Sequence, residues 1–239
     1  MKYSKVKMIL ILTISLVLIA TTILLLANKF LPSIDISFNN NLFVNKLLKY
    51  QLLAVILSLT LMFFTLKLTP QSKSLLSFGN VKSVAIKEKW LGINGKSTWK
   101  INGLQLAFFI SLATGIFMFI AVKYTNSLSN FQYWFIPVII FISLTNSFSE
   151  EIIYRFVING NLGLIAPKIT ILIISAILFG LPHYMGYPNG IAGVIMSAML
   201  GYILSKATYE TNGLGIALTI HFIQDLIIFT ALFMMNIKK

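Results

Sequence analysis

The sequence lacks cysteine, has few acidic residues and contains a single arginine. Without cysteine, the chain has neither a disulfide framework nor a thiolate nucleophile. Charged residues make up only 10% of the 239 residues, hydrophobic residues make up 57%, and the mean hydropathy is +0.88, which excludes an ordinary soluble domain. The G-x-S-x-G motif of serine hydrolases and the H-E-x-x-H motif of zinc proteases are also absent.

The chain does contain apolar stretches of about 20 residues, the length that crosses a bilayer as a helix. We expect helices near Met8–Asn28, Tyr50–Leu66, Gly103–Val122, Tyr133–Val157, Lys168–Pro182, Gly190–Ser205 and Leu214–Asn236. An eighth span stays open if the connection Lys73–Lys100 contains an interfacial helix. The sequence therefore predicts an all-α, polytopic membrane helix bundle of seven to eight spans, with residues 1–239 as a single integral membrane domain.

The net charge of +13 comes from 19 basic residues, only one of which is arginine, against six acidic ones. Lysines gather before the first helix and in the segment 67–102, and fewer occupy the opposing connections, where Lys29, Lys46, Lys49 and Lys123 lie. The positive-inside rule then predicts a cytoplasmic amino terminus and a basic cytoplasmic loop at 67–102. The lipid bilayer accounts for this charge, and no nucleic acid is needed. The excess of lysine over arginine favours a bacterial source, and hence a multi-pass protein of a bacterial cell membrane.

Two adjacent carboxylates, Glu150 and Glu151, interrupt an apolar run, where each charge costs about 2.5–3.5 kcal/mol even on the lenient insertion scale. Arg155 lies four residues after Glu151 and shares its helical face. Glu150 is rotated by about 100° from Glu151, so the two need not have the same role. Glu150 is suited to act as a general base, and Glu151–Arg155 is either a structural pair or part of the same site.

Both histidines of the chain lie in later apolar segments. His183 follows Pro182, which ends a helix, and is either a site residue or a solvated histidine at the end of a span. His221 and Asp225 are four apart on one helical face, where a carboxylate can fix the histidine tautomer or share a ligand; the alternative is a self-satisfied buried pair. With the acidic pair, these residues predict a polar intramembrane cavity formed by a catalytic helix core at 130–236.

Three motifs, Glu150-Glu151-x-x-x-Arg155, Phe179-x-x-x-His183 and His221-x-x-x-Asp225, resemble in order and spacing the signature of the CAAX-prenyl-endopeptidase and bacteriocin-processing (Abi, or CPBP) intramembrane proteases. The resemblance implies a helical bundle with a conical cavity, in which Glu150 activates water and His183 assists it. By the same resemblance, His221 and the residue four positions later stabilise the oxyanion. The family often has asparagine at the position of Asp225, and an ionised aspartate would repel an oxyanion. That role then falls to His221, or Asp225 is protonated or binds a metal.

The family is commonly labelled metalloprotease, and a zinc ion held by Glu150, His183 and His221 is chemically reasonable. Metal-free activation of water by Glu150 stays open beside it.

The sequence thus predicts an intramembrane endopeptidase that hydrolyses a membrane-associated, leader or precursor peptide. One alternative is an ion-coupled transporter, because intramembrane carboxylates and histidines also form proton relays. Another is a non-catalytic scaffold or a bacteriocin immunity protein that acts by binding a partner.

Overall fold

The computed structural model of the protein describes residues 2–186 and 189–237. Within these ranges the chain is helical and forms no strand, which confirms the all-α prediction. The α-helices are α1 (Lys2–Phe30), α2 (Leu42–Leu68), α3 (Trp99–Tyr124), α4 (Phe135–Glu151), α5 (Val157–Leu162), α6 (Lys168–Gly180), α7 (Gly190–Thr211) and α8 (Gly215–Asn236). Shorter turns are η1 (Leu31–Ser33), η2 (Pro70–Leu76), η3 (Lys89–Leu91), η4 (Leu128–Asn130), η5 (Ile152–Phe156) and η6 (Leu181–Tyr184).

Six helical segments are long and apolar enough to cross a membrane. They are Val6–Ser33, Leu42–Leu68, Trp99–Tyr124, Phe135–Leu162, Gly190–Thr211 and Gly215–Asn236. The predicted span Lys168–Pro182 is a shorter apolar helix, Lys168–Tyr184. The 13 residues of α6 extend over only about 20 Å, less than the ~30 Å of hydrocarbon in a bilayer. Six of the predicted spans are therefore confirmed as helices long and apolar enough to cross a bilayer, and α6 is too short to cross one alone.

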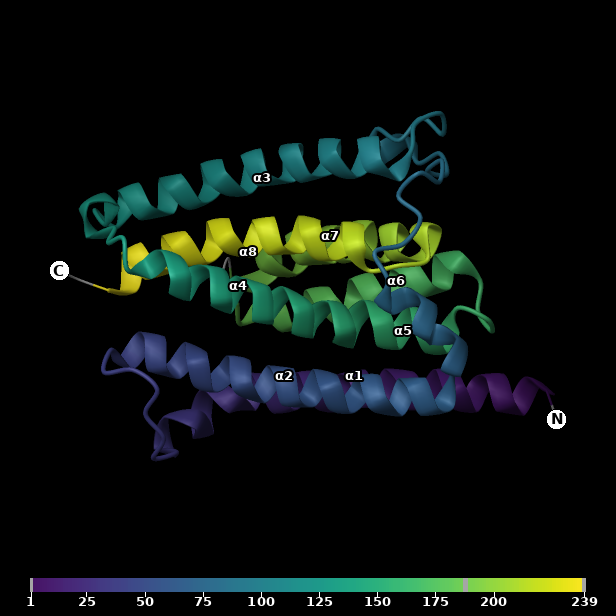
Figure 1. Ribbon diagram of the computed structural model, residues 1–239, viewed down its shortest axis with the longest axis horizontal. Coiled ribbons are helices and arrows are strands. Elements are labelled where there is room, and N and C mark those ends of the chain that lie inside the picture. Colours follow the sequence, from purple (N-terminus) through teal and green to yellow (C-terminus); the bar gives the residue numbers. More distant parts are fainter. Residues whose placement is uncertain (1, 187–188, 238–239) are drawn as a thin grey trace.

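The helices form three layers (Figure 1). Helices α1 and α2 pack together as one outer layer, and α3 lies on the opposite side, where it contacts mainly α8. Between them lie α4, α6, α7 and α8. The amino end of α1 and the carboxyl end of α8 are at opposite ends of the bundle (Figure 1).

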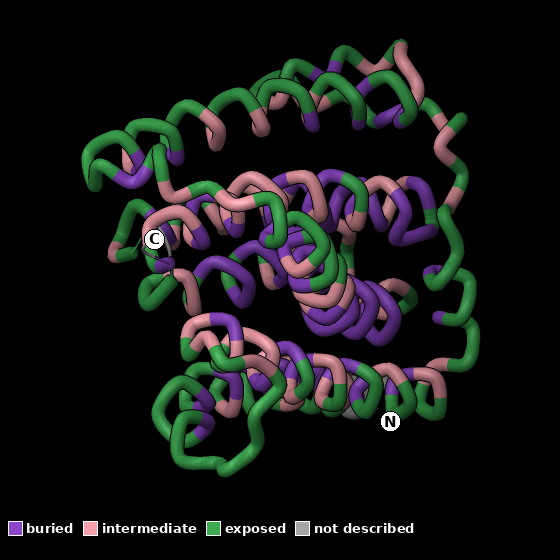
Figure 2. The backbone as a smooth tube through the Cα atoms, turned by 60° about the vertical axis from the view of Figure 1, so that its left-hand side comes forward, coloured by how far each residue is buried: buried purple, intermediate pink, exposed green. Residues whose placement is uncertain are grey.

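The interior of the bundle is the continuous helical segment α4–η5–α5, in which every residue from Glu151 to Leu162 is buried. Figure 2 shows buried residues concentrated in the central layer, whereas α3 is mainly exposed and intermediate. A helix that is apolar on all sides favours such a central position. The acidic pair Glu150–Glu151 lies at the start of this buried stretch.

Helices α6 and α7 form a closely packed hairpin that fixes the position of η6. A Cβ atom on Gly180 would lie 2.8 Å from both the Val194 carbonyl and the Ala198 side chain, and one on Gly201 would meet Ala176 at 3.1 Å. Small residues at these positions therefore let the two backbones approach. Pro182 ends the regular helix, and the following turn carries His183.

Helix α2 begins at Leu42 rather than at the predicted Tyr50, because Asn41 caps it by accepting hydrogen bonds from the backbone N–H groups of Phe43 and Val44. Lys46 and Lys49 consequently lie within the helix and not in a loop. The Lys49 ammonium is buried and donates to the Ile34 carbonyl at 2.6 Å, which ties α2 to the α1–α2 connection.

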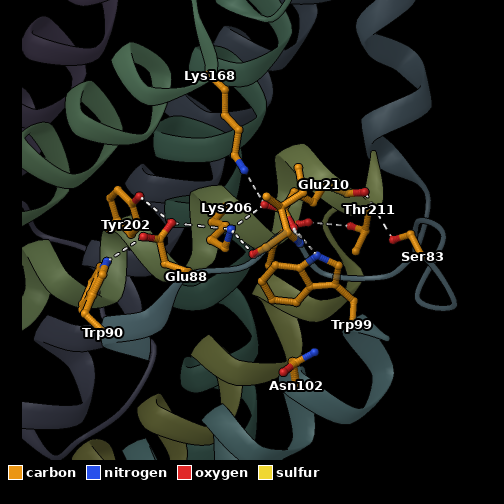
Figure 3. Close-up of polar contacts among 12 residues, drawn as sticks. Ser83, Glu88, Trp90, Trp99, Asn102, Lys168, Tyr202, Lys206, Glu210 and Thr211 are labelled. Atoms are coloured by element: carbon orange, nitrogen blue, oxygen red, sulfur yellow. Dashed lines mark hydrogen bonds and ion pairs between the residues drawn. The ribbon is translucent and has the colours of Figure 1, made fainter. Parts of the chain in front are cut away.

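The connection between α2 and α3, predicted as the basic loop 67–102, is folded against the helices. It contains η2, η3 and isolated β-bridges from Val84 to Thr98 and from Glu88 to Ile93. In the described part of this connection no helix approaches the length of a span. Its second half is held by a cluster of partly and fully buried charges that the sequence did not reveal (Figure 3).

In this cluster, the Glu210 carboxylate forms ion pairs with Lys168 and with the fully buried Lys206, whose ammonium lies at 2.6 Å. The indole of Trp99 donates to the same carboxylate at 2.9 Å. Lys206 also lies 3.7 Å from Glu88 in the connection (Figure 3). The charges of α6, α7 and the connection therefore neutralise one another, which is the arrangement that makes buried charge tolerable.

Candidate active site

The structure brings the three sequence motifs together at the centre of the bundle. Glu150 and Glu151 end α4, Arg155 lies in η5, His183 in η6, and His221 and Asp225 in the first half of α8. The His221 imidazole is the meeting point, because carboxylates from all three acidic positions lie within 3.8 Å of its ring nitrogens. Residues up to 75 positions apart in the sequence thus surround one ring.

Glu151 has two partners and is almost completely buried. Its Oε1 atom accepts a hydrogen bond from His221 Nδ1 at 2.7 Å and lies 3.2 Å from an Arg155 guanidinium nitrogen. The guanidinium also stacks over the Phe179 ring, 4.0 Å from its centroid, which favours the cation. Glu151–Arg155 is therefore a buried ion pair, which agrees with the interpretation of these two residues as a structural pair. The pair also fixes the orientation of His221.

Glu150 is placed differently from its neighbour. Its Oε2 atom lies 3.4 Å from His221 Nε2, on the opposite edge of the ring from Glu151. The Glu150 side chain is 19% exposed, against 1% for Glu151. One carboxylate of the pair therefore faces a cavity, and the other belongs to the protein interior.

His183 reaches the same cavity from η6. Its Nδ1 atom is 2.8 Å from the Phe179 carbonyl oxygen and donates to it, so that Nε2 is the acceptor of the ring. The Phe179 ring packs between the two imidazoles, with centroids 4.8 Å from His183 and 5.6 Å from His221. Phe179 therefore holds both histidines in place.

The cavity in front of these groups has a volume of about 240 Å³. Glu150, His183, His221 and Asp225 line it, together with apolar side chains of α3, α7 and α8. Of the six predicted site residues, these four face the cavity, and Glu151 and Arg155 lie behind it.

Asn146 is a site residue that the sequence analysis missed. Its side-chain amide donates to Glu150 Oε1 at 3.3 Å and to Asp225 Oδ2 at 3.1 Å, so that it bridges the two carboxylates. The Gln51 side chain of α2 donates to the side-chain oxygen Oδ1 of Asn146 at 3.2 Å and thereby fixes the orientation of the Asn146 amide. Asn146 lies four residues before Glu150, and this spacing could have identified Asn146 from the sequence. The sequence holds no comparable signal for Gln51.

The acidic pair lies where the α-helix widens into a π-helical turn, Ile152–Phe156. Such turns occur often at functional sites, because they change which residues share a helix face. Here the turn begins directly after Glu151 and includes Arg155.

A metal ion would need several of these side chains to converge. The separation of 3.4 Å between Glu150 Oε2 and His221 Nε2 suits two ligands of one zinc ion, whose ligand atoms lie about 3.3 Å apart in a tetrahedral site. A third ligand with matching placement is not found, since no group of three or more His, Asp or Glu in residues 2–186 and 189–237 is arranged to hold an ion. The described geometry thus offers two ligands and does not fit the full zinc site predicted from Glu150, His183 and His221.

Comparison with known proteins gives one family. Residues 132–227 match the model of the family described as type II CAAX prenyl endopeptidase Rce1-like. No curated protein and no solved structure matches the chain. The matched segment contains all six predicted site residues and confirms the family resemblance that the three motifs indicated.

Proposed function

We propose, on the premise that residues 132–227 belong to the Rce1-like proteases, that this protein is an intramembrane endopeptidase that hydrolyses a peptide bond at the Glu150–His221 site. The observation that carries the proposal is the placement of Glu150, at the wall of a cavity and 3.4 Å from His221 Nε2, while Glu151 is withdrawn into an ion pair. A reactive carboxylate and a held imidazole are the parts that water activation requires.

In this reaction, Glu150 accepts a proton from a water molecule, and the water oxygen attacks the peptide carbonyl carbon to give a tetrahedral oxyanion. The carbon–nitrogen bond then breaks, and Glu150 returns the proton to the leaving amine. One water molecule is consumed, and one carboxyl and one amino end are formed. His183 Nε2, as an acceptor, holds the second hydrogen of the attacking water.

His221 is the donor to the oxyanion. Because its Nδ1–H is given to Glu151, Nε2 donates only when the ring is an imidazolium. Glu150, Glu151 and Asp225 all lie within 3.8 Å of the ring and stabilise that positive charge. Deleting one oxyanion donor in other enzymes costs on the order of 3–4 kcal/mol of transition-state stabilisation.

Asp225 has no direct part in this scheme. Its carboxylate would repel an oxyanion, and it instead accepts from Asn146 and lies 3.8 Å from His221 Nε2. The neutral amide of Asn146 donates to both Glu150 and Asp225 and so lies between the two carboxylates.

No step of this scheme passes through a metal. A zinc ion would supply a polarised peptide carbonyl and a bound water of lowered pKa, but the described side chains offer it only two ligands. A zinc-dependent enzyme would lose activity in a strong chelator and regain it with added zinc, and the metal-free scheme predicts unchanged activity.

For orientation in the membrane, we propose a cytoplasmic amino terminus. The end of the bundle at which α1 begins also contains the α2–α3 connection, with its lysines at positions 73, 82, 87, 89 and 96. The opposite end holds fewer lysines, at positions 29, 46, 49 and 123. The positive-inside rule assigns the richer end to the cytoplasm.

The direct test uses the purified protein in lipid nanodiscs with a library of peptides that carry an apolar anchor, and mass spectrometry of the products. We expect one class of peptide to be cut by the wild-type protein and to remain intact with Glu150→Ala or His183→Ala. Asp35→Asn, which removes an exposed carboxylate in the α1–α2 connection, is the matched control and should cleave as the wild type does. Ion flux in proteoliposomes without any cleavage would instead support the transporter alternative, and wild-type cleavage by Glu150→Ala would refute the assignment of the base.

A further inference from the structure

Glu150 and His183 take part in the walls of two cavities. The first is the cavity of about 240 Å³ described above, between α3, α4, α7 and α8. The second has a volume of about 160 Å³ and lies on the other side of these two residues, between α1, α2 and η6. The proposed catalytic carboxylate can therefore be approached from two directions.

The walls of the two cavities differ in chemistry. Away from the polar groups of the candidate active site, the first is lined mainly by apolar side chains, among them Ile110 and Leu200. The second is bordered by hydroxyl and amide groups, those of Thr21, Asn28, Tyr50 and Tyr154. Of these, Thr21 and Tyr154 are joined by a hydrogen bond of 2.8 Å between their hydroxyl oxygens. A water molecule in a buried site needs two to four polar partners, and the hydroxyl and amide groups of the second cavity can supply them.

The lining of the second cavity extends from Glu150 to Asn28, near the end of α1. Its lining residues Thr21 to Asn28 belong to the last third of α1, and Tyr50 belongs to the first third of α2. These lining residues lie toward the end of the bundle where α1 and α2 are connected, an end that Figure 1 shows opposite the amino terminus. Asn28, near the end of α1, is exposed.

Hydrolysis has two reactants of opposite polarity, an apolar membrane-bound peptide and water. Resting on the proposed function, we propose that the second cavity is the route by which water reaches Glu150, and that the first receives the peptide. With separate routes, a bound peptide that fills the apolar cavity does not cut off the water that must attack it. The Thr21–Tyr154 pair and Asn28 form the polar wall of this route.

The absence of cysteine from the chain allows a direct test, because each single-cysteine variant carries one thiol. Leu25 lines the second cavity, and Leu26 beside it does not, although the two side chains are similarly exposed, at 38% and 48%. A thiol reacts as the thiolate, which forms in water and not in lipid. With a charged methanethiosulfonate reagent added to both sides of proteoliposomes, we expect Leu25→Cys to be labelled on the order of 10²-fold faster than Leu26→Cys. Equal rates would overturn the proposal.

The second arm measures cleavage of a peptide selected from the library. The adduct on Leu25→Cys should lower kcat by about tenfold with little change in KM, because it obstructs water and not peptide. The adduct on Ile110→Cys, in the first cavity, should mainly raise KM. A rise in KM from the Leu25→Cys adduct, or unchanged kinetics, would refute the separate water route. If unmodified variants and wild type cleave nothing, the proposed function fails, and the labelling rates still decide whether the cavity is wet.

Discussion

The two adjacent glutamates give a sharp prediction, because the same isosteric substitution should mainly lower activity at one position and mainly lower stability at the other. Glu150→Gln removes the proposed base at the wall of the cavity, where the carboxylate is partly exposed. We expect cleavage to fall on the order of 10²–10⁴-fold, the range attributed to a general base, with little effect on stability. Glu151→Gln instead removes the charge that neutralises the fully buried Arg155, so the protein should be strongly destabilised.

The size of the second effect follows from the burial of the pair. Arg155 is 0% exposed, and apart from Glu151 its charge contacts the Phe179 ring. Removing one partner of a buried ion pair costs about 3–5 kcal/mol, because the other charge is left uncompensated. For a chain of this size, 1 kcal/mol shifts the melting temperature by about 2–4 °C, so Glu151→Gln should lower it by roughly 6–20 °C.

Thermal unfolding in one detergent, followed by circular dichroism, measures this difference, and the peptide assay measures cleavage. The double variant Glu151→Gln/Arg155→Met removes both charges and should be more stable than Glu151→Gln alone, since no buried charge is left unpaired. Asp35→Asn controls for the loss of an exposed carboxylate. A melting temperature that falls as much for Glu150→Gln as for Glu151→Gln would refute the division of roles, as would a double variant no more stable than the single one.

Two further predictions concern residues that only the structure revealed. Asn146→Leu removes the amide that donates to Glu150 and Asp225. Because a hydrogen bond to a charged group contributes about 1.5–3 kcal/mol, we expect kcat for peptide cleavage to fall about 10- to 150-fold. The control variant Thr145→Val, on the same helix, should cleave as the wild type does. Glu210→Gln weakens the cluster that holds the α2–α3 connection. If the free energy of local opening falls by about 1–3 kcal/mol, trypsin should cleave at the lysines between Gly79 and Thr98 roughly 5- to 150-fold faster. An unchanged cleavage rate would show that this cluster does not hold the connection.

The sequence predicted the helices well and indicated residues that the structure brings together, and for a common physical reason. Helices in a membrane must satisfy their own backbone hydrogen bonds, so apolar length alone indicates them. A charge in such a segment carries a cost, so Glu150, His183 and His221 stood out as residues with a special role. Distances within one helix were equally accessible, since Glu151 and Arg155 pair at the spacing of four residues that suggested it.

Contacts between helices were not accessible in this way. That His221 contacts both glutamates, one on each side of the ring, depends on how α4 and α8 pack, and no spacing in the sequence encodes it. The same holds for Gln51, which reaches Asn146 from α2, and for Lys206, whose partners include Glu88 from a connection predicted as a loop. The start of α2 was also misplaced, because the cap at Asn41 lies ahead of the apolar run that marked the helix.

The arrangement of charge explains how a site of this kind can exist inside a helix bundle. Glu151 and Arg155 are withdrawn from solvent and neutralise each other, and the hydrogen bond that His221 Nδ1 donates to Glu151 makes the imidazole part of that rigid unit. Glu150 accepts a hydrogen bond from the neutral amide of Asn146 and lies near the far edge of the same ring, and it lines both cavities. The buried pair therefore provides the rigidity that orients His221, and the carboxylate beside it retains the partial exposure that proton transfer to and from water requires. Under the proposed function, a single acidic residue at this position could supply one of these properties and would lack the other, which accounts for two consecutive glutamates.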